Sequence, residues 1–287
     1  SNSFCTLLVI VLDQMAAQIL ALPAAEARSA AVKDGLRGHQ LDPQAIATAF
    51  AADTVNVGVG KPLLAAMVEW AFDDDCSADD AIAICDAVIK ATSRRITAFG
   101  EEAVRAREVL ADVYECSEQP QNAVNVLLGM PTESGLRSAG DEYKVSLYVR
   151  IAELSLDLDN TVQAEAYVKK AWTLVREVFD AELKLRFEAC HAKVCDVKRR
   201  FLEAAQRFYQ LSQRVDDWMD ALQKAIVCIV LEDAGPKRSR LIATIFRDER
   251  TAACGELGAI LGKVYHDRVL REKDVAALDP FLKPHHR

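Results

Sequence analysis

Residues 141–234 decide the fold, because these 94 residues contain neither Gly nor Pro; they begin DEYKVSLYVRIAELSLDLDN and end MDALQKAIVCIVLEDA. The segment is rich in Ala, Leu, Val, Glu, Lys and Arg, a composition that favours helix. One continuous helix would be about 140 Å long and would need a heptad seam that this sequence does not sustain. The segment therefore predicts several helices separated by polar corners.

The corners are predicted at short groups of charged or polar residues. These groups are Asp159–Asn160, Asp180, Lys198–Arg199–Arg200 and Asp216–Asp217. Between them we expect five helices, over residues 141–158, 161–179, 181–197, 200–214 and 217–233.

An internal repeat runs through this segment and the residues before it. Three pairs of alanines, each 12 residues apart, recur at intervals of 41 and 40 residues: Ala111 with Ala123, Ala152 with Ala164, and Ala192 with Ala204. Small residues at such positions let two antiparallel helices approach closely. A period near 40 residues is typical of TPR-like or HEAT-like repeats. We predict an all-α fold, a right-handed α-solenoid of antiparallel helix pairs, with a non-repetitive helical bundle as the alternative.

Weaker signals organise the rest of the chain. Ala71 and Ala83 suggest an earlier copy of the repeat. Capping residues, Gly and Pro predict where helices start and where they are interrupted. These positions are Asp42–Pro43, Ser77 with Asp80, Gly100, the span 129–140 and Gly235–Pro236. The predicted organisation is a helical arm over residues 1–100, helical repeats over 101–233 and a further helical region over 234–287.

Composition and charge exclude several classes of protein. The 12 Gly and 8 Pro are too few for the frequent turns of a sandwich or barrel. The net charge of −8 argues against nucleic-acid binding, which rests on excess positive charge. The charge is uneven, since residues 1–143 carry −11 and residues 144–287 carry +3. The acidic half therefore favours a basic protein partner, or serves as a solubilising face.

Two basic clusters at predicted corners are the candidate protein-interface residues. They are Lys198, Arg199 and Arg200 in the first cluster, and Lys237, Arg238 and Arg240 in the second. Long cationic side chains at a corner can instead complement the carbonyl end of the preceding helix. The sequence leaves both interpretations open.

The N-terminus and the cysteines bear on the compartment. The apolar stretch from Phe4 to Leu22 is interrupted by Asp13 and Gln14 and has no basic residue before it, so we expect an amphipathic or buried helix and no membrane partner. The eight Cys form no Cys-x-x-Cys pair and are interpreted as reduced thiols of the cytoplasm or nucleus.

No catalytic motif is complete, and no cofactor is expected. Gly58, Gly60 and Lys61 lack the remaining residues of a phosphate-binding loop and are interpreted as a turn between helices. The adjacent histidines His285 and His286 are interpreted as a solvated tail.

One metal-ligand spacing is present. Cys190, His191 and Cys195 share a predicted helix, and His191 and Cys195 have the spacing of a ligand pair. Buried small residues are the favoured interpretation of the cysteines. A metal-dependent helical-repeat hydrolase remains the enzyme alternative to a non-catalytic protein.

Longer stretches resemble a known family. Residues 201–212 (FLEAAQRFYQLS), 221–231 and 234–250 (AGPKRSRLIATIFRDER) closely resemble subunit four of the COP nine signalosome, a PCI-domain family. Residues 134–137, 141–144 and 164–171 look like the same family. The resemblance is strong from about residue 101 onward and faint before it.

The resemblance implies a non-catalytic scaffold: a helical-repeat arm that leads into a PCI helical bundle with a winged helix. It implies other signalosome subunits and cullin-RING ligase components as partners, in a complex that removes a ubiquitin-like modifier from cullins in the cytoplasm and nucleus. The family pattern continues past residue 285, so the chain is expected to be a truncated form that lacks the winged helix. The rival is the paralogous scaffold subunit of the proteasome lid. No residue of this family carries catalysis, so no catalytic position is transferred.

Overall fold

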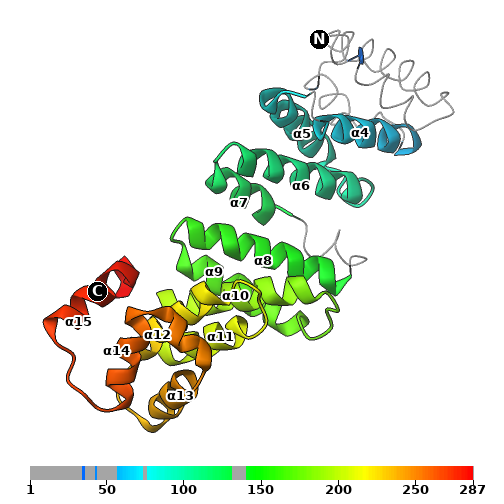
Figure 1. The fold of residues 1–287 in the computed structure, drawn as a ribbon. Coiled ribbons are helices and arrows are strands. Elements are labelled where there is room, and N and C mark those ends of the chain that lie inside the picture. The colour runs from blue at the N-terminus through cyan, green and yellow to red at the C-terminus, as the bar shows by residue number, and fades with distance from the viewer. Residues whose placement is uncertain (1–33, 36–42, 44–56, 74–75, 131–139, 287) are drawn as a thin grey trace. The chain divides into compact units, whose positions relative to one another are not determined.

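The computed structural model describes residues 34–35, 43, 57–73, 76–130 and 140–286 (Figure 1). Every regular element in these ranges is helical, which confirms the all-α fold class. The chain divides into two compact units, Ser1–Gly140 and Asp141–Arg287. The division lies at the end of the predicted break over residues 129–140. The predicted boundaries at residues 100 and 233, and the right-handed sense of the solenoid, stay predictions.

Unit 1 contains four described helices. They are α4 (Val57–Ala71), α5 (Ala78–Thr92), α6 (Gly100–Cys116) and α7 (Pro120–Leu128). The Ser77 hydroxyl accepts a hydrogen bond from the backbone N–H of Asp80 at 3.2 Å, which confirms the predicted cap of α5. Gly100 begins α6, as expected, with two glutamates in its first turn. The core of this unit is formed between α4, α5 and α6, around Leu64, Met67 and Phe99.

Unit 2 begins with two helix pairs and a fifth helix. They are α8 (Asp141–Asp157), α9 (Thr161–Leu174), α10 (Ala181–Val197), α11 (Phe201–Ser212) and α12 (Trp218–Leu231). The five predicted helices are confirmed, and the bounds of the third are exact. The second was predicted too long, because α9 ends at Leu174 and not at residue 179.

The remainder of unit 2 packs against α12 and α11. It comprises α13 (Pro236–Phe246), the 3₁₀ helix η1 (Glu249–Cys254), α14 (Glu256–Tyr265), α15 (Glu272–Leu278), η2 (Asp279–Phe281) and η3 (Pro284–His286). Pro236 occupies the first turn of α13, where its missing N–H has no helical acceptor, as the Gly235–Pro236 break predicted. The core of this region joins Ile226 of α12, Ile245 of α13 and Leu261 of α14.

The alanine repeat lies in the buried interior of the helix pairs. All six repeat alanines are 0% exposed. The larger residues four positions after the second alanine of each pair, Leu127, Val168 and Phe208, are also buried. Small side chains therefore stand where helices approach and larger ones fill the space beside them, as the repeat predicted. The suggested earlier copy is wrong, because Ala83 is exposed.

The corner within each pair has the same backbone geometry. Glu118, Asp159 and Arg199, which are 41 and 40 residues apart, have φ angles of 56°, 56° and 57°. The next backbone N–H in each case donates to a carbonyl five residues earlier, at 2.8, 2.8 and 2.9 Å. This is the left-handed turn that closes a helix by satisfying its last carbonyl groups. The repeat therefore extends to a single backbone conformation at equivalent positions.

Other sequence-based predictions are wrong or fall outside the described residues. Gly58 and Gly60 lie inside α4 and not in a turn, so that prediction is wrong. The predicted cap at Asp42 and the predicted helix over residues 4–22 lie outside the described residues. Within the described ranges, none of the helices has the length and apolar character needed to cross a membrane.

Candidate protein-interaction surface

The first basic cluster is largely occupied by contacts within unit 2. Lys198, at the end of α10, forms an ion pair with Glu165 of α9. Arg200 lies 3.6 Å from the Glu203 carboxylate, and it also donates to the Cys195 sulfur at 3.3 Å. Arg199 stands over the ring of Phe201 at 5.8 Å. These cations hold the corner and the neighbouring helix together, although their side chains remain exposed.

The Lys198–Glu165 contact lowers the pKa of the carboxylate. The hydrogen bonds from Lys198 and from Lys169 lower the pKa of Glu165 to about 2. The carboxylate therefore stays ionised in the folded chain well below the pH at which a free Glu takes up a proton. The pair links the two successive helix pairs of unit 2, since Glu165 belongs to α9 and Lys198 to α10.

The second basic cluster divides between structure and surface. Arg238 donates to the carbonyl oxygens of Ile229 and Val230 at 3.1 and 3.2 Å. It therefore satisfies the carbonyl end of α12, which is the structural role expected for a cation at a corner. Lys237 and Arg240 are exposed, and neither forms an ion pair or hydrogen bond through its side chain with the described residues. Their charges face solvent.

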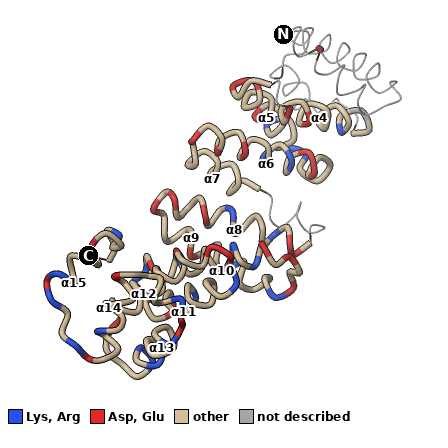
Figure 2. Tube along the Cα trace, viewed as in Figure 1, with Lys and Arg blue, Asp and Glu red and all other residues tan. Residues whose placement is uncertain are grey.

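A third cation completes a surface that the sequence analysis missed. Arg247, at the C-terminal end of α13, is exposed and lies seven residues after Arg240. With Lys237, Arg240 and Thr244 it has the spacing i, i+3, i+7 and i+10, which places all four on one helical face about 15 Å long. The opposite face of α13 buries Ile242 and Ile245. We call Lys237, Arg240 and Arg247 the α13 basic stripe; basic residues of this helix are blue in Figure 2.

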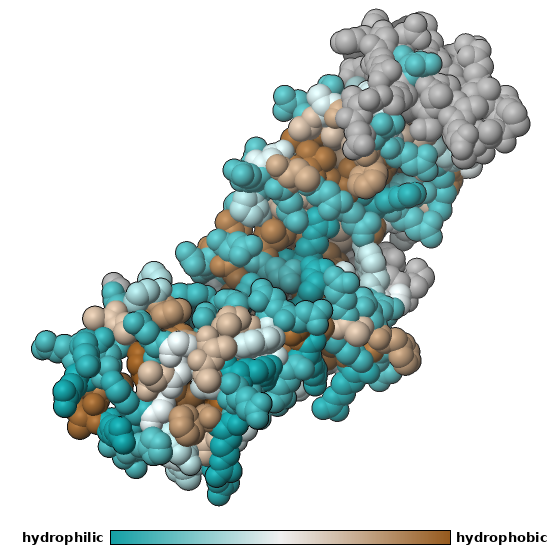
Figure 3. Space-filling model, in the orientation of Figure 1, coloured by the Kyte–Doolittle hydropathy of each residue, from teal (hydrophilic) through white to brown (hydrophobic). Residues whose placement is uncertain are grey.

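The α13 basic stripe is polar, not an apolar groove. On the face shown in Figure 3, unit 2 is mainly hydrophilic, with apolar atoms in separate patches. α13 itself, Pro236–Phe246, contains no acidic residue. The stripe therefore presents positive charge without internal neutralisation, and what it can bind is an acidic surface.

The three residues of α10 with metal-ligand spacing do not come together. Cys190 and Cys195 are buried, which confirms their interpretation as small core residues. His191 packs edge-on against Trp172 and Phe187 at ring separations of 5.6 and 5.7 Å. Burial, aided by Arg207 and Arg200, lowers the pKa of His191 to about 4, so its ring is neutral at pH 7. Among the described residues, these three do not form a metal-ligand group.

The interpretation of His285 and His286 as a solvated tail is wrong. His286 is 8% exposed, and both rings lie against the carboxylate of Asp196. The sequence carries no local signal for this contact, because Asp196 and His286 are 90 residues apart.

Comparison with known proteins places these observations in a family. Residues 58–216, more than half of the chain, match the family described as PSMD12/CSN4, N-terminal. The chain belongs to this family. The matched region of this PSMD12/CSN4 member begins in α4 and ends just before α12, so it contains all three alanine pairs.

Several curated relatives of this PSMD12/CSN4 member carry the same name. The chain is 39% identical over 204 residues to COP9 signalosome complex subunit 4 of Arabidopsis thaliana, covering 67% of this chain and 51% of that protein. It is 39% identical over 199 residues to the Drosophila melanogaster protein of the same name, covering 67% and 48%. The chain thus spans about half the length of the curated relatives it matches.

One solved structure is similar at the level of helical architecture. It is YrrB, described as a TPR protein with an unusual peptide-binding site, with a TM-score of 0.43 and 17% identity. The alignment covers 77% of this chain and 99% of that one.

Proposed function

We propose that this chain is part of a non-catalytic scaffold subunit of a COP9 signalosome, the complex that removes a ubiquitin-like modifier from cullin-RING ubiquitin ligases. The observation that carries the proposal is the 37–39% identity to signalosome subunit 4 of four organisms. Its partners are other signalosome subunits and cullin-RING ligase components, and it acts in the cytoplasm and nucleus.

The charge distribution supports two protein contacts of opposite sign. Residues 1–143 carry −11, which attracts a basic surface of the cullin-RING assembly. The α13 basic stripe attracts an acidic surface on a signalosome or cullin-RING component. Such pairs steer association and fix register more than they add affinity.

The six basic residues predicted from the sequence contribute unequally to this proposal. Lys237 and Arg240, with Arg247 added, are free to meet a partner. Lys198, Arg200 and Arg238 already bind within unit 2, and Arg199 covers Phe201. The stripe is therefore the part of the candidate interface on which we base the experiment.

The test compares two charge reversals of equal size. Lys237→Glu with Arg240→Glu alters the stripe, and Arg176→Glu with Lys193→Glu alters two exposed cations of unit 2 outside α13. Binding of the full chain to purified signalosome subunits and to a cullin-RING complex is measured by biolayer interferometry at two salt concentrations.

We expect the stripe variant to bind about tenfold more weakly, since two interface charges of roughly 0.7 kcal/mol each are reversed, and the control to bind like the parent chain. Equal loss in both variants would mean that only net charge matters. Absence of binding by the parent chain to either partner would overturn the proposed function.

The proteasome lid subunit is the second candidate, because the matched family carries both names. The signalosome is preferred because the similarity to signalosome subunit 4 extends over 199–213 residues in plant, insect and fungal proteins.

A further inference from the structure

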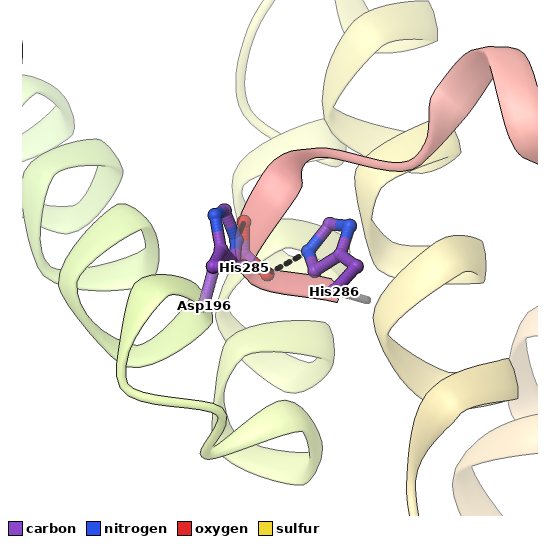
Figure 4. A group of neighbouring side chains, drawn as sticks. All are labelled: Asp196, His285 and His286. Atoms are coloured by element: carbon purple, nitrogen blue, oxygen red, sulfur yellow. Dashed lines mark hydrogen bonds and ion pairs between the residues drawn. The ribbon is translucent and has the colours of Figure 1, made fainter.

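Three side chains from distant parts of unit 2 meet in one cluster. Asp196 lies near the end of α10, and His285 and His286 belong to η3; their ligand-type atoms all lie within 4.8 Å of one another. The Nε2 atom of His286 is 2.8 Å from Asp196 Oδ1, and the Nε2 atom of His285 is 3.2 Å from Asp196 Oδ2. Figure 4 shows the two rings beside the single carboxylate.

A buried thiol adjoins the cluster from another helix but is not one of its ligand atoms. Cys228 of α12 is 1% exposed, and its sulfur donates to Asp196 Oδ1 at 3.3 Å. Asp196 itself is only 2% exposed. Burial, together with the adjacent Asp196 carboxylate, raises the pKa of the Cys228 thiol, so the thiol is protonated at pH 7.

One atom of the cluster lacks a satisfactory partner. The Nε2 atom of His285 is buried, and although it lies 3.2 Å from Asp196 Oδ2, it makes no aligned hydrogen bond within the described part of the chain. A ring nitrogen bonds only in the plane of its ring, so the short distance alone does not satisfy this atom. Burying such an atom without a partner costs free energy.

The donor set matches one class of metal ion. Two imidazole nitrogens and one carboxylate oxygen are the three protein ligands of open Zn²⁺ sites, in which water takes the fourth position, whereas Mg²⁺ and Ca²⁺ prefer oxygen alone. We propose that Asp196, His285 and His286 bind Zn²⁺ in this way.

The hydrogen bonds of the cluster show where its protons lie before an ion binds. The backbone N–H of Lys283 donates to His286 Nδ1 at 3.1 Å, so the ring proton is on Nε2 and is donated to Asp196. On binding, this proton moves to Nδ1, the Lys283 contact is released, and Nε2 binds the ion. Cys228 keeps its proton, because its sulfur is not among the ligand atoms.

The site would fasten η3 to α10 of the repeat region. α10 supplies Asp196, and η3 supplies both histidines. A pocket beside the cluster, lined by Val227, Phe281 and Lys283 among others, gives the ion a route to it. This role is independent of any signalosome partner.

The experiment uses the full chain without an affinity tag, stripped of metal and titrated with Co²⁺ and then Zn²⁺. We expect one equivalent of Co²⁺ to give the intense visible bands of a four-coordinate ion, which one equivalent of Zn²⁺ should abolish. His285→Gln should bind at least about tenfold more weakly, as loss of even an outer-sphere partner does.

Matched controls come from the same unit. Cys254→Ser changes a buried cysteine outside the cluster, and His266→Gln another histidine, and both should bind like the parent chain. Circular dichroism of each metal-free variant verifies that it is folded. Absence of stoichiometric binding by the folded parent chain, or a Co²⁺ affinity that His285→Gln leaves unchanged, would overturn the site.

Discussion

The left-handed corners of the repeat predict that glycine substitutions at two adjacent residues change the stability in opposite directions. Glu118 has φ of 56° and is exposed, and it joins α6 to α7. A side chain in this conformation costs about 1–2 kcal/mol, which glycine avoids, while glycine adds about 0.5–1 kcal/mol of chain entropy to folding. We therefore expect Glu118→Gly to stabilise unit 1 by about 0.5–1 kcal/mol.

The neighbouring residue supplies the control. Ser117 has φ of −86° and ψ of 10°, a conformation that any residue adopts. Ser117→Gly gains no steric relief and only adds chain entropy, so it should destabilise the chain by about 0.5–1 kcal/mol. Arg199→Gly, at the equivalent corner of unit 2, should stabilise less than Glu118→Gly, because it gives up the contact with Phe201 that is worth about 0.5 kcal/mol.

Differential scanning calorimetry is the assay, because it can separate transitions of the two units. For units of this size a change of 1 kcal/mol moves the Tm by roughly 3 °C. An increase for Glu118→Gly with a decrease for Ser117→Gly is expected. A decrease of similar size in both variants would refute the reasoning that the corner stores backbone strain.

Three further predictions concern unit 2. Glu165→Gln should lower the free energy of unfolding by about 0.5–1 kcal/mol near pH 7, since it removes an exposed ion pair with Lys198. Urea titrations of the parent and the variant should show this difference disappear as the pH falls from about 4.5 to about 2, because the native carboxylate is then protonated. His191 should titrate by NMR with a midpoint near pH 4. The free energy of unfolding should decline as the pH falls from 6.5 toward 4, because the unfolded chain takes up the proton first. If His191→Gln showed the same dependence of stability on pH in that range as the parent chain, the prediction would be contradicted. Arg238→Ala should destabilise the chain by about 1.5–3 kcal/mol, because it leaves the carbonyl groups of Ile229 and Val230 without their charged donor, whereas exposed Arg240→Ala should change thermal unfolding by less than about 0.5 kcal/mol.

Local signals in the sequence were sufficient for most helix bounds within residues 141–234. Asn160 and Asp180 were recognisable corners because both accept hydrogen bonds from the first turn of the next helix. The six alanines revealed the helix pairing because close approach requires small residues at fixed spacing. The end of α9 was missed because the residues after Leu174 contain no Gly, Pro or capping side chain before Asp180.

Other features depend on contacts that local patterns do not carry. Glu118 and Arg199 have no preference for left-handed backbone, so the shared corner becomes evident only from the hydrogen bonds that enforce it. The burial of His286 depends on a residue 90 positions away. Arg247 could have been found, since it continues the spacing of Lys237 and Arg240, but residues 234–287 were predicted only as a further helical region, without helix bounds.

The most direct test of the proposed function is a choice between two assemblies. The immobilised full chain is presented with purified signalosome subunits assembled without subunit 4, and separately with a proteasome lid assembled without its paralogous subunit. We predict saturable binding to the signalosome subunits that is at least about tenfold tighter than binding to the lid, a difference of about 1.4 kcal/mol. Tighter binding to the lid, or no binding to the signalosome subunits, would contradict the assignment.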